Sequence, residues 1–221
     1  MSTRLFLVRH GEGVWNAEQR LQGQGNPPLS AHGRYQARAL ADVFSARPLA
    51  AVYCSQLARA WETALCIAAP HRLCPRVIAA AGEVNLGAWQ GQSPADMSVD
   101  TRESYRAWLA NPSAVQPPGG EALEAAGSRV ASVVDALLGE HRGATVVLVT
   151  HSIIGRVLLC HLLGAGLELV PRLKLKTGSI SLVRLHDGGA VLERLGDVSH
   201  LHAQRTRPGG TGELTRVGAQ S

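Results

Sequence analysis

Lysine, aromatic residues and long apolar stretches are scarce in this chain. Among its 221 residues, 22 are basic but only Lys174 and Lys176 are lysines, and phenylalanine, tryptophan and tyrosine together make up 4%. No apolar stretch approaches the roughly 20 residues that a membrane-spanning helix needs. The apolar run that follows Arg4 is too short for the core of a signal peptide, so we expect a cytoplasmic protein without a membrane partner.

Cysteine is neither paired nor clustered. The four cysteines, Cys54, Cys66, Cys74 and Cys160, form no C-x-x-C pair and have no histidine at zinc-finger spacing. This argues against a structural zinc site or a disulfide framework, and we expect reduced and mostly buried thiols. With 45% hydrophobic residues, the chain can build a packed core without such crosslinks.

The formal net charge is +5. Apart from the C-terminal tail, the arginines are scattered and form no dense stripe, so nucleic acid is not the expected partner. A guanidinium group presents a planar fork that matches phosphate and carboxylate oxygens. A small phosphorylated metabolite is therefore a better match to this composition.

Strands and helices alternate along the sequence. Residues 145–150 are continuously apolar and β-branched, which is typical of a strand covered on both faces, and Ser30 is suited to cap a helix. Strands are expected at 5–8, 50–54, 76–79 and 145–150, helices after Ser30 and at 57–69, 95–110, 121–137 and 151–162, and a hairpin at 178–196. The sequence predicts an α/β fold, a three-layer α/β/α arrangement with a mostly parallel sheet and a C-terminal β-hairpin.

Residues 1–202 are expected to form a single domain. Glycine and proline punctuate 84–120, which indicates an excursion from the main layers, a common place for substrate selection. Residues 203–221 lack an apolar period and are rich in glycine and arginine, so we expect a disordered tail there.

Two histidines follow expected buried strands. Arg9 and His10 come directly after the first strand, and His151 comes directly after the strand at 145–150. Ligands of open α/β sheets bind beyond the carboxyl ends of the strands, so these residues are expected to meet in one pocket. A neutral histidine held in one tautomer can act as a nucleophile, and Arg9 suits an anionic electrophile.

Two further groups add to this chemistry. Arg59 lies in the first turns of a helix that follows a strand, where the helix N-terminus already favours anions. Glu83 lies among small and apolar residues, where a carboxyl group can serve as a proton donor. Each residue alone also has an ordinary interpretation: a solvated loop histidine for His10, a surface ion pair for Arg59, a loop carboxylate for Glu83 and a helix-capping or core-edge histidine for His151.

Taken together, the motifs resemble the histidine phosphatase superfamily, the phosphoglycerate mutase-like proteins, over roughly residues 4–202. The opening R-H-G-x-x-x-x-N is met by Arg9 to Asn16, and S-x-L-x-R-A-x-x-T-A is met in full by Ser55 to Ala64. Further similar segments are Gln22 to Gly33, the E-x-x-x-G-x-W-x-G pattern from Glu83 to Gly91, and Gly119 to Leu123 with Arg129. Gly13 departs from a common Ser or Thr, Ser152 from a frequent Gly, and Ala122 from the usual Ser.

The resemblance implies a role for each matching residue. His10 is expected to take the phosphoryl group as the nucleophile, and Glu83 to protonate the leaving oxygen and then activate water. The phosphoryl oxygens are expected to be bound by Arg9, Asn16, Gln22, Arg59, His151 and Ser152. Two arginines and a protonated histidine can stabilise this transition state without a divalent metal, so neither a metal nor another cofactor is expected.

The motifs also favour one branch of the family. R-H-G is not followed by x-R-x-P, which argues against acid phosphatases and phytases, and Glu83 to Gly87 differ from the E-R-H-Y-G of the mutases. We therefore expect a metal-independent phosphomonoester hydrolase with a phosphohistidine intermediate, and a homodimer is allowed. By resemblance, candidate substrates are sugar phosphates, phosphoglycerate derivatives, phosphoserine and α-ribazole phosphate. The alternatives are a phosphoglycerate mutase and a non-catalytic phospholigand- or nucleic-acid-binding protein that uses the arginines of its tail.

Overall fold

The computed structural model describes residues 2–203, and the tail expected at 203–221 lies almost wholly outside this range. A six-stranded sheet has the order β3-β2-β4-β1-β5-β6. Its strands are β1 (Thr3–Arg9), β2 (Ala51–Cys54), β3 (Arg76–Val77), β4 (Thr145–Thr150), β5 (Ile180–His186) and β6 (Gly189–Asp197). The first four run parallel to one another, and β5 and β6 add an antiparallel hairpin. The predicted mostly parallel sheet with a C-terminal hairpin is confirmed.

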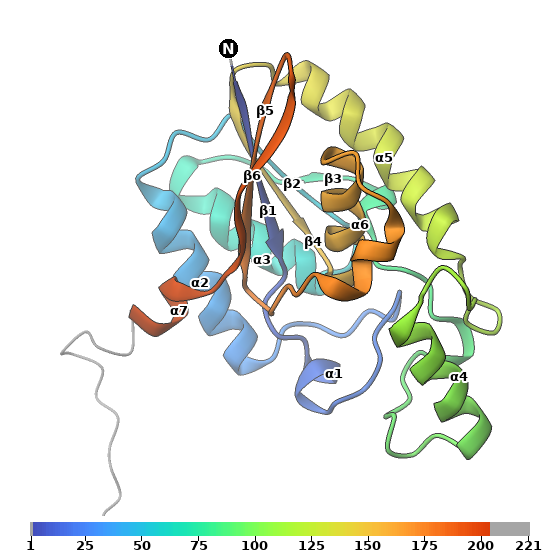
Figure 1. The fold of residues 1–221 in the computed structure, drawn as a ribbon. Helices are drawn as coiled ribbons and strands as arrows, with labels where there is room; N and C mark the ends of the chain where they lie inside the picture. Colours follow the sequence, from blue (N-terminus) through green and yellow to red (C-terminus); the bar gives the residue numbers. More distant parts are fainter. Residues whose placement is uncertain (1, 204–221) are drawn as a thin grey trace, which may run out of the picture.

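The main helices form a layer on each face of the sheet (Figure 1). One layer contains α2 (Ala31–Ser45) and α3 (Ala58–Ala68), and the other contains α5 (Leu123–Glu140) and α6 (Ser152–Leu162). The expected three-layer arrangement is therefore correct. The remaining helices are α1 (Val14–Ala17), α4 (Val99–Ala110), α7 (Ser199–Ala203) and the 3-10 segments η1 (Ala69–His71), η2 (Ala79–Ala81), η3 (Gly87–Trp89) and η4 (Leu167–Arg172).

Alternation along the central strands divides the core into two apolar layers. Leu5 and Leu7 of β1 point toward α5 and α6, whereas Phe6 and Val8 point toward α2 and α3. The ring of Phe6 meets that of Phe44 of α2 edge to face, with centroids 5.1 Å apart. Because successive side chains of a strand face opposite sides, a buried strand must be apolar throughout, as the run at 145–150 is.

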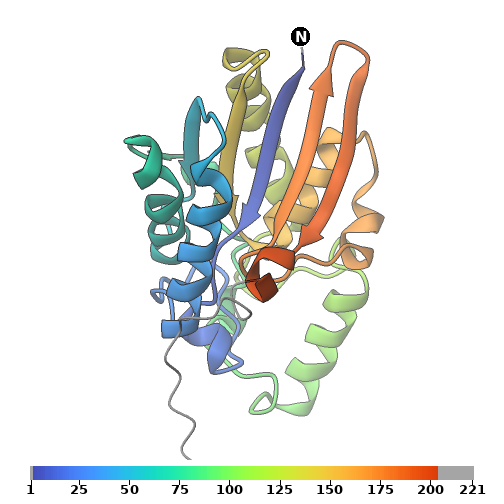
Figure 2. The ribbon, with the colours of Figure 1, turned by 90° about the vertical axis from the view of Figure 1, so that its left-hand side faces the viewer.

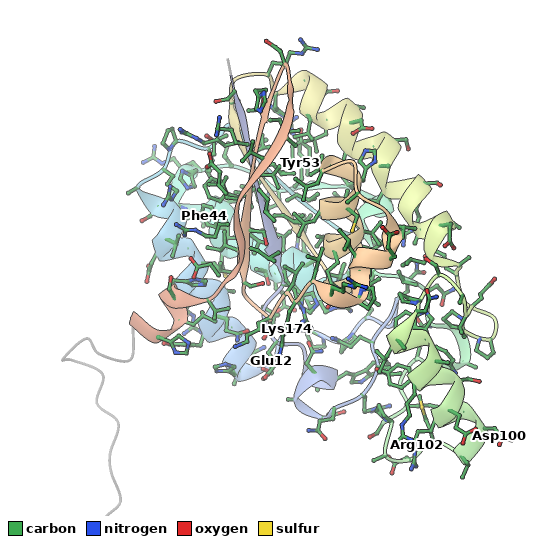
Figure 3. The ribbon with its side chains drawn as sticks, viewed as in Figure 1. Glu12, Phe44, Tyr53, Asp100, Arg102 and Lys174 are labelled. Carbon is green, nitrogen blue, oxygen red and sulfur yellow. The ribbon has the colours of Figure 1, made fainter. Side chains whose placement is uncertain are left out.

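Helix α4 extends beyond the carboxyl ends of the strands, far from the turn of the β5–β6 hairpin (Figure 2). Its residues Asp100 and Arg102 lie well away from the sheet (Figure 3). The excursion expected at 84–120 is only partly outside the main layers, because Val84, Leu86 and Met97 are buried in the same core layer as α5 and α6. Its first part therefore belongs to the core, and α4 is the part that projects. Within residues 2–203, no helix combines the length and apolar character that a bilayer crossing requires.

Candidate active site

Strand register brings the predicted residues together. In the parallel pair of β1 and β4, Arg9 lies opposite Thr150, so His10 and His151 leave neighbouring strands at the same edge of the sheet. Their rings are 5.0 Å apart between centroids. On the other side of β4, Cys54 of β2 pairs with Val149, which places Ser55 at the same edge.

His10 is buried and held in one orientation. Its Nδ1 lies 2.5 Å from the carbonyl oxygen of Gly11, an acceptor, so the proton is on Nδ1. Nε2 is then the basic nitrogen, and it accepts a hydrogen bond of 3.2 Å from Nε of Arg59. Burial lowers the pKa of His10 well below its ordinary value, and the charges of Arg59 and Arg9 lower it further. The imidazole is therefore neutral, with a lone pair on Nε2, which is the state that a nucleophile requires.

His151 lies beneath His10 and is fully buried. Its Nε2 is 2.6 Å from the hydroxyl oxygen of Ser55, and its Nδ1 has no hydrogen-bond partner among residues 2–203. Burial and the charge of Arg59 lower the pKa of His151 well below its ordinary value, so its imidazole is neutral and the expectation of a protonated histidine is wrong. Although His151 occupies the position before α6, its side chain makes no capping hydrogen bond, so the helix-capping interpretation is wrong.

Arg59 is a buried cation without a counter-ion. Its Nη1 and Nη2 donate to the carbonyl oxygens of Gly25 and Gly23 at 2.7 and 2.8 Å, and its side chain is 0% exposed. No ion pair in the described chain involves Arg59, so the surface-pair interpretation is wrong. Burial lowers its pKa to about 10, which leaves the guanidinium charged at neutral pH.

Arg9 supplies a second such charge. Its Nη1 donates to the carbonyl oxygen of Leu175 at 2.6 Å, while its Nε has no partner within residues 2–203. Burial lowers its pKa to about 10 as well. Gln22 is buried with an unpartnered Oε1, and Oδ1 of Asn16 accepts from the backbone N–H of Gly13 at 3.0 Å. Both amide side chains line the same cavity as Arg9.

Glu83 lies at the N-terminus of α6. Its carboxylate accepts backbone N–H bonds of 3.1 and 3.2 Å from Ile153 and of 3.1 Å from Ile154. Helix N-termini present unpaired N–H groups, which favour a negative group. The loop that carries Glu83 is thereby tied to the helix that starts directly after His151.

Arg129 of α5 holds the same loop from its other side. It donates to the carbonyl oxygens of Gly82 and Glu83 at 2.9 and 3.1 Å, and also to that of Ala80. Its Nε and Nη2 bind the two carboxylate oxygens of Glu121 at 2.6 and 3.0 Å. Arg129 and the segment from Gly119 to Leu123 form one of the motifs on which the family resemblance rests. In the structure they anchor the backbone of Glu83.

These groups surround a cavity of about 240 Å³. The predicted residues that line it are Arg9, His10, Asn16, Gln22, Arg59, Glu83 and Ser152, while His151 packs under His10 without lining it. Trp108 lines the cavity, Trp89 is buried in the core, and Trp15 stacks with Arg20 at 4.7 Å. In the part of the chain that the structure describes, no three His, Cys, Asp or Glu side chains are grouped to hold a metal ion.

Sequence reasoning did not single out four side chains of the site. Arg20, Tyr105 and Arg156 line the cavity, and Ser55 contacts His151. Ser55 belongs to one of the matching motifs, and it directly follows an apolar strand, which is the same sequence feature that indicates His10. Arg156 lies four residues after Ser152, on the same face of α6, which is a spacing that a sequence can show.

Neutral His10 beside two guanidinium groups that no carboxylate pairs with, at the carboxyl ends of parallel strands, is an arrangement suited to phosphoryl transfer. Comparison with known proteins agrees. The profile of the histidine phosphatase superfamily (branch 1) matches residues 5–198, and the chain belongs to this superfamily.

Individual relatives agree in fold and differ in the activity named. A metal-independent phosphoserine phosphatase of Arabidopsis thaliana is 34% identical over 204 residues, which cover 90% of this chain and 83% of that protein. A probable phosphoglycerate mutase of Enterobacter is 33% identical over 210 residues, covering 90% and 95%. The structure of a mycobacterial glucosyl-3-phosphoglycerate phosphatase superposes with a TM-score of 0.82 at 28% identity, covering 89% and 99%.

Proposed function

We propose that the chain hydrolyses phosphate monoesters of small metabolites through a phosphohistidine on Nε2 of His10. The observation that carries the proposal is the environment of His10: Nδ1–H is held by the carbonyl oxygen of Gly11, and the lone pair of Nε2 faces the guanidinium of Arg59. The attacking nitrogen and a cation for the transferred group are thus positioned before the substrate binds, as phosphoryl transfer requires.

In the first step, the lone pair of Nε2 attacks phosphorus and the bond to the ester oxygen breaks. Glu83 gives its proton to that oxygen, so the alcohol leaves neutral. Negative charge on the phosphoryl oxygens is stabilised by Arg9, Arg59 and Nδ1 of His151, which carries the proton when Nε2 accepts from the hydroxyl of Ser55. Asn16, Gln22 and Ser152 are further donors. In the second step, Glu83 takes a proton from water, the water oxygen attacks phosphorus, and the bond to Nε2 breaks to release phosphate.

No step of this mechanism requires a divalent metal, because the guanidinium groups neutralise the charge. Hydrolysis of p-nitrophenyl phosphate is therefore expected to continue in excess EDTA, and His10→Ala is expected to abolish it. Protein recovered from a reaction that is quenched during turnover should carry a phosphoryl group, and this group should be labile in acid and stable in alkali. Complete loss of activity on chelation, or a phosphoryl group on serine, would contradict the mechanism.

Phosphoglycerate mutase activity is the second candidate, because several relatives are named as probable phosphoglycerate mutases. The same phosphohistidine serves both reactions; they differ in whether water or a second hydroxyl receives the phosphoryl group. Incubation with 3-phosphoglycerate and a bisphosphate primer distinguishes them. A hydrolase releases inorganic phosphate, and a mutase forms 2-phosphoglycerate.

A further inference from the structure

The cavity contains a cation beyond those that the phosphoryl group uses. Arg156 lines it from α6 and is half-buried. Its Nε donates to the carbonyl oxygen of Ser152 and its Nη1 to that of Val170, both at 3.0 Å. No carboxylate of the described chain pairs with it. The side chain is therefore fixed in direction by two neutral acceptors, and its charge is left for another partner.

Tyr105 of α4 lines the same cavity, close enough to Arg156 for the charge of Arg156 to act on it. Its ring stacks on Trp108, with centroids 6.1 Å apart and planes at 20°, and meets the edge of Trp89 at 5.6 Å. Burial raises the pKa of Tyr105, and the neighbouring charge of Arg156 opposes this rise. The hydroxyl has no hydrogen bond to any of residues 2–203 that the structure records, so the ring is held by its aromatic neighbours while the O–H is left free to donate into the cavity that Arg156 also lines.

The charges of the cavity indicate what these two donors bind. Glu83 is the one carboxylate among the lining residues, and it is neutral when it carries the proton for the leaving group. Arg20 is already paired with Glu18 at 3.2 Å. Three guanidinium groups then remain, on Arg9, Arg59 and Arg156, whereas the phosphate monoester supplies only two negative charges.

We propose that Arg156 and the Tyr105 hydroxyl bind a carboxylate on the alcohol part of the substrate, and so select phosphate esters of small hydroxy acids. This inference rests on the proposed phosphatase function. A carboxylate supplies the third negative charge, and it is a suitable acceptor for a guanidinium nitrogen and a hydroxyl.

The position of Arg156 limits how far that carboxylate lies from the ester oxygen. Arg156 is one turn beyond Ser152, about 6 Å along the helix axis, and its side chain turns back to the carbonyl oxygen of Ser152. The guanidinium group thus lies close to the first turn of α6, where Ile153 and Ile154 bind Glu83. Because Glu83 protonates the ester oxygen, only a few bonds separate that oxygen from the carboxylate.

The test compares 3-phosphoglycerate with glycerol 3-phosphate, which has a hydroxymethyl group in place of the carboxylate. We expect the wild-type kcat/KM to be about tenfold to a hundredfold higher for 3-phosphoglycerate, as for a charge-assisted hydrogen bond. In Arg156→Met this ratio is expected to fall to about 1, and in Arg156→Lys to an intermediate value. Tyr105→Phe should lower it by less than Arg156→Met. Arg106→Met, an exposed arginine of α4, is the matched control and should keep the wild-type ratio.

Each other outcome is decisive. If the wild type hydrolyses neither these esters nor p-nitrophenyl phosphate, the proposed function fails. If it hydrolyses p-nitrophenyl phosphate but neither ester, if it hydrolyses both esters equally well, or if Arg156→Met keeps the wild-type ratio, only the carboxylate site fails. If Arg156→Met loses p-nitrophenyl phosphate hydrolysis through misfolding, the ratios of Tyr105→Phe and Arg156→Lys decide instead. A preference for propane-1,3-diol bisphosphate over 3-phosphoglycerate would assign a second phosphate to Arg156 and overturn the carboxylate.

Discussion

Replacing Arg129 is expected to impair catalysis through Glu83, although Arg129 does not line the cavity. Its guanidinium holds the carbonyl oxygens of Gly82 and Glu83 and pairs with Glu121. Breaking a buried ion pair from one side costs about 3–5 kcal/mol. Because 24% of the Arg129 side chain and 17% of that of Glu121 are exposed, we expect Arg129→Met to cost about 2–3 kcal/mol of folding free energy, less than for full burial.

The kinetic consequence depends on the leaving group. General acid catalysis contributes about 10²–10⁴-fold, and a displacement of roughly 1 Å can cost about 10²-fold. For an alkyl phosphate, whose alcohol needs a proton, kcat/KM of Arg129→Met is expected to fall about 100-fold. For p-nitrophenyl phosphate, whose phenolate leaves without one, it should fall less than about 3-fold. The parameter kcat/KM is used because hydrolysis of the phosphohistidine does not enter it.

Two variants control for a general loss of structure. Arg129→Lys keeps a charge and part of the bonding, so it should recover part of the alkyl phosphate activity. Arg102 also donates to backbone carbonyl oxygens, those of Ala95 and Met97, but in a segment that does not carry Glu83. Arg102→Met should therefore leave the dependence on the leaving group unchanged. Equal losses of kcat/KM for both substrates in Arg129→Met would refute this account of Glu83.

Further predictions concern the hydrogen bonds and charges around His10. The hydroxyl of Thr63 accepts from the N–H of Gly11 at 3.1 Å and donates to the carbonyl oxygen of Arg59 at 2.7 Å. Thr63→Val removes this hydroxyl and leaves the buried N–H of Gly11 unpaired, which costs about 1–3 kcal/mol of folding free energy. The calorimetric Tm of Thr63→Val is expected to be about 2–10 °C lower than that of the wild type. The Tm of Thr63→Ser, which keeps the hydroxyl, should stay within about 2 °C of the wild-type value. Equal Tm shifts in the two variants would contradict the role of the hydroxyl. Because positive neighbours and burial disfavour the imidazolium, NMR titration should show His10 neutral from neutral pH to well below pH 6.5. Arg59→Gln removes one positive charge and should raise the midpoint, and a wild-type midpoint at or above pH 6.5 would contradict the electrostatic argument.

The part of the site that lies on strand ends was predictable from the sequence. Apolar runs predict β1 and β4, parallel strands end at one edge of a sheet, and His10 and His151 follow those runs. Ser30 was also predicted correctly as a helix cap, since its hydroxyl accepts from the N–H of Gly33 at 2.9 Å. These inferences use only local pattern and the geometry of a parallel sheet.

The part contributed by packing was not predictable in the same way. Whether Tyr105 of α4 faces solvent or the cavity depends on its packing against Trp89 of η3, a contact between two separate elements that the pattern of a single helix does not show. Arg156 could equally have been a surface arginine of α6. Segment 84–120 was expected as one excursion because glycine and proline hide that Val84, Leu86 and Met97 belong to the core.

The buried charge of Arg59, which no carboxylate of the described chain compensates, costs folding free energy and is available to bind an oxyanion. Burying a cation beside neutral carbonyl groups costs folding free energy, but Arg59→Met would in turn leave the carbonyl oxygens of Gly23 and Gly25 without their donor. The variant is therefore expected to be inactive without a large gain in heat resistance. Any oxyanion that pairs with the guanidinium recovers the cost of burying the charge, and saturation with a tight ligand at 100 times its Kd adds about 2.7 kcal/mol. Orthovanadate or phosphate in the storage buffer should thus preserve the enzyme.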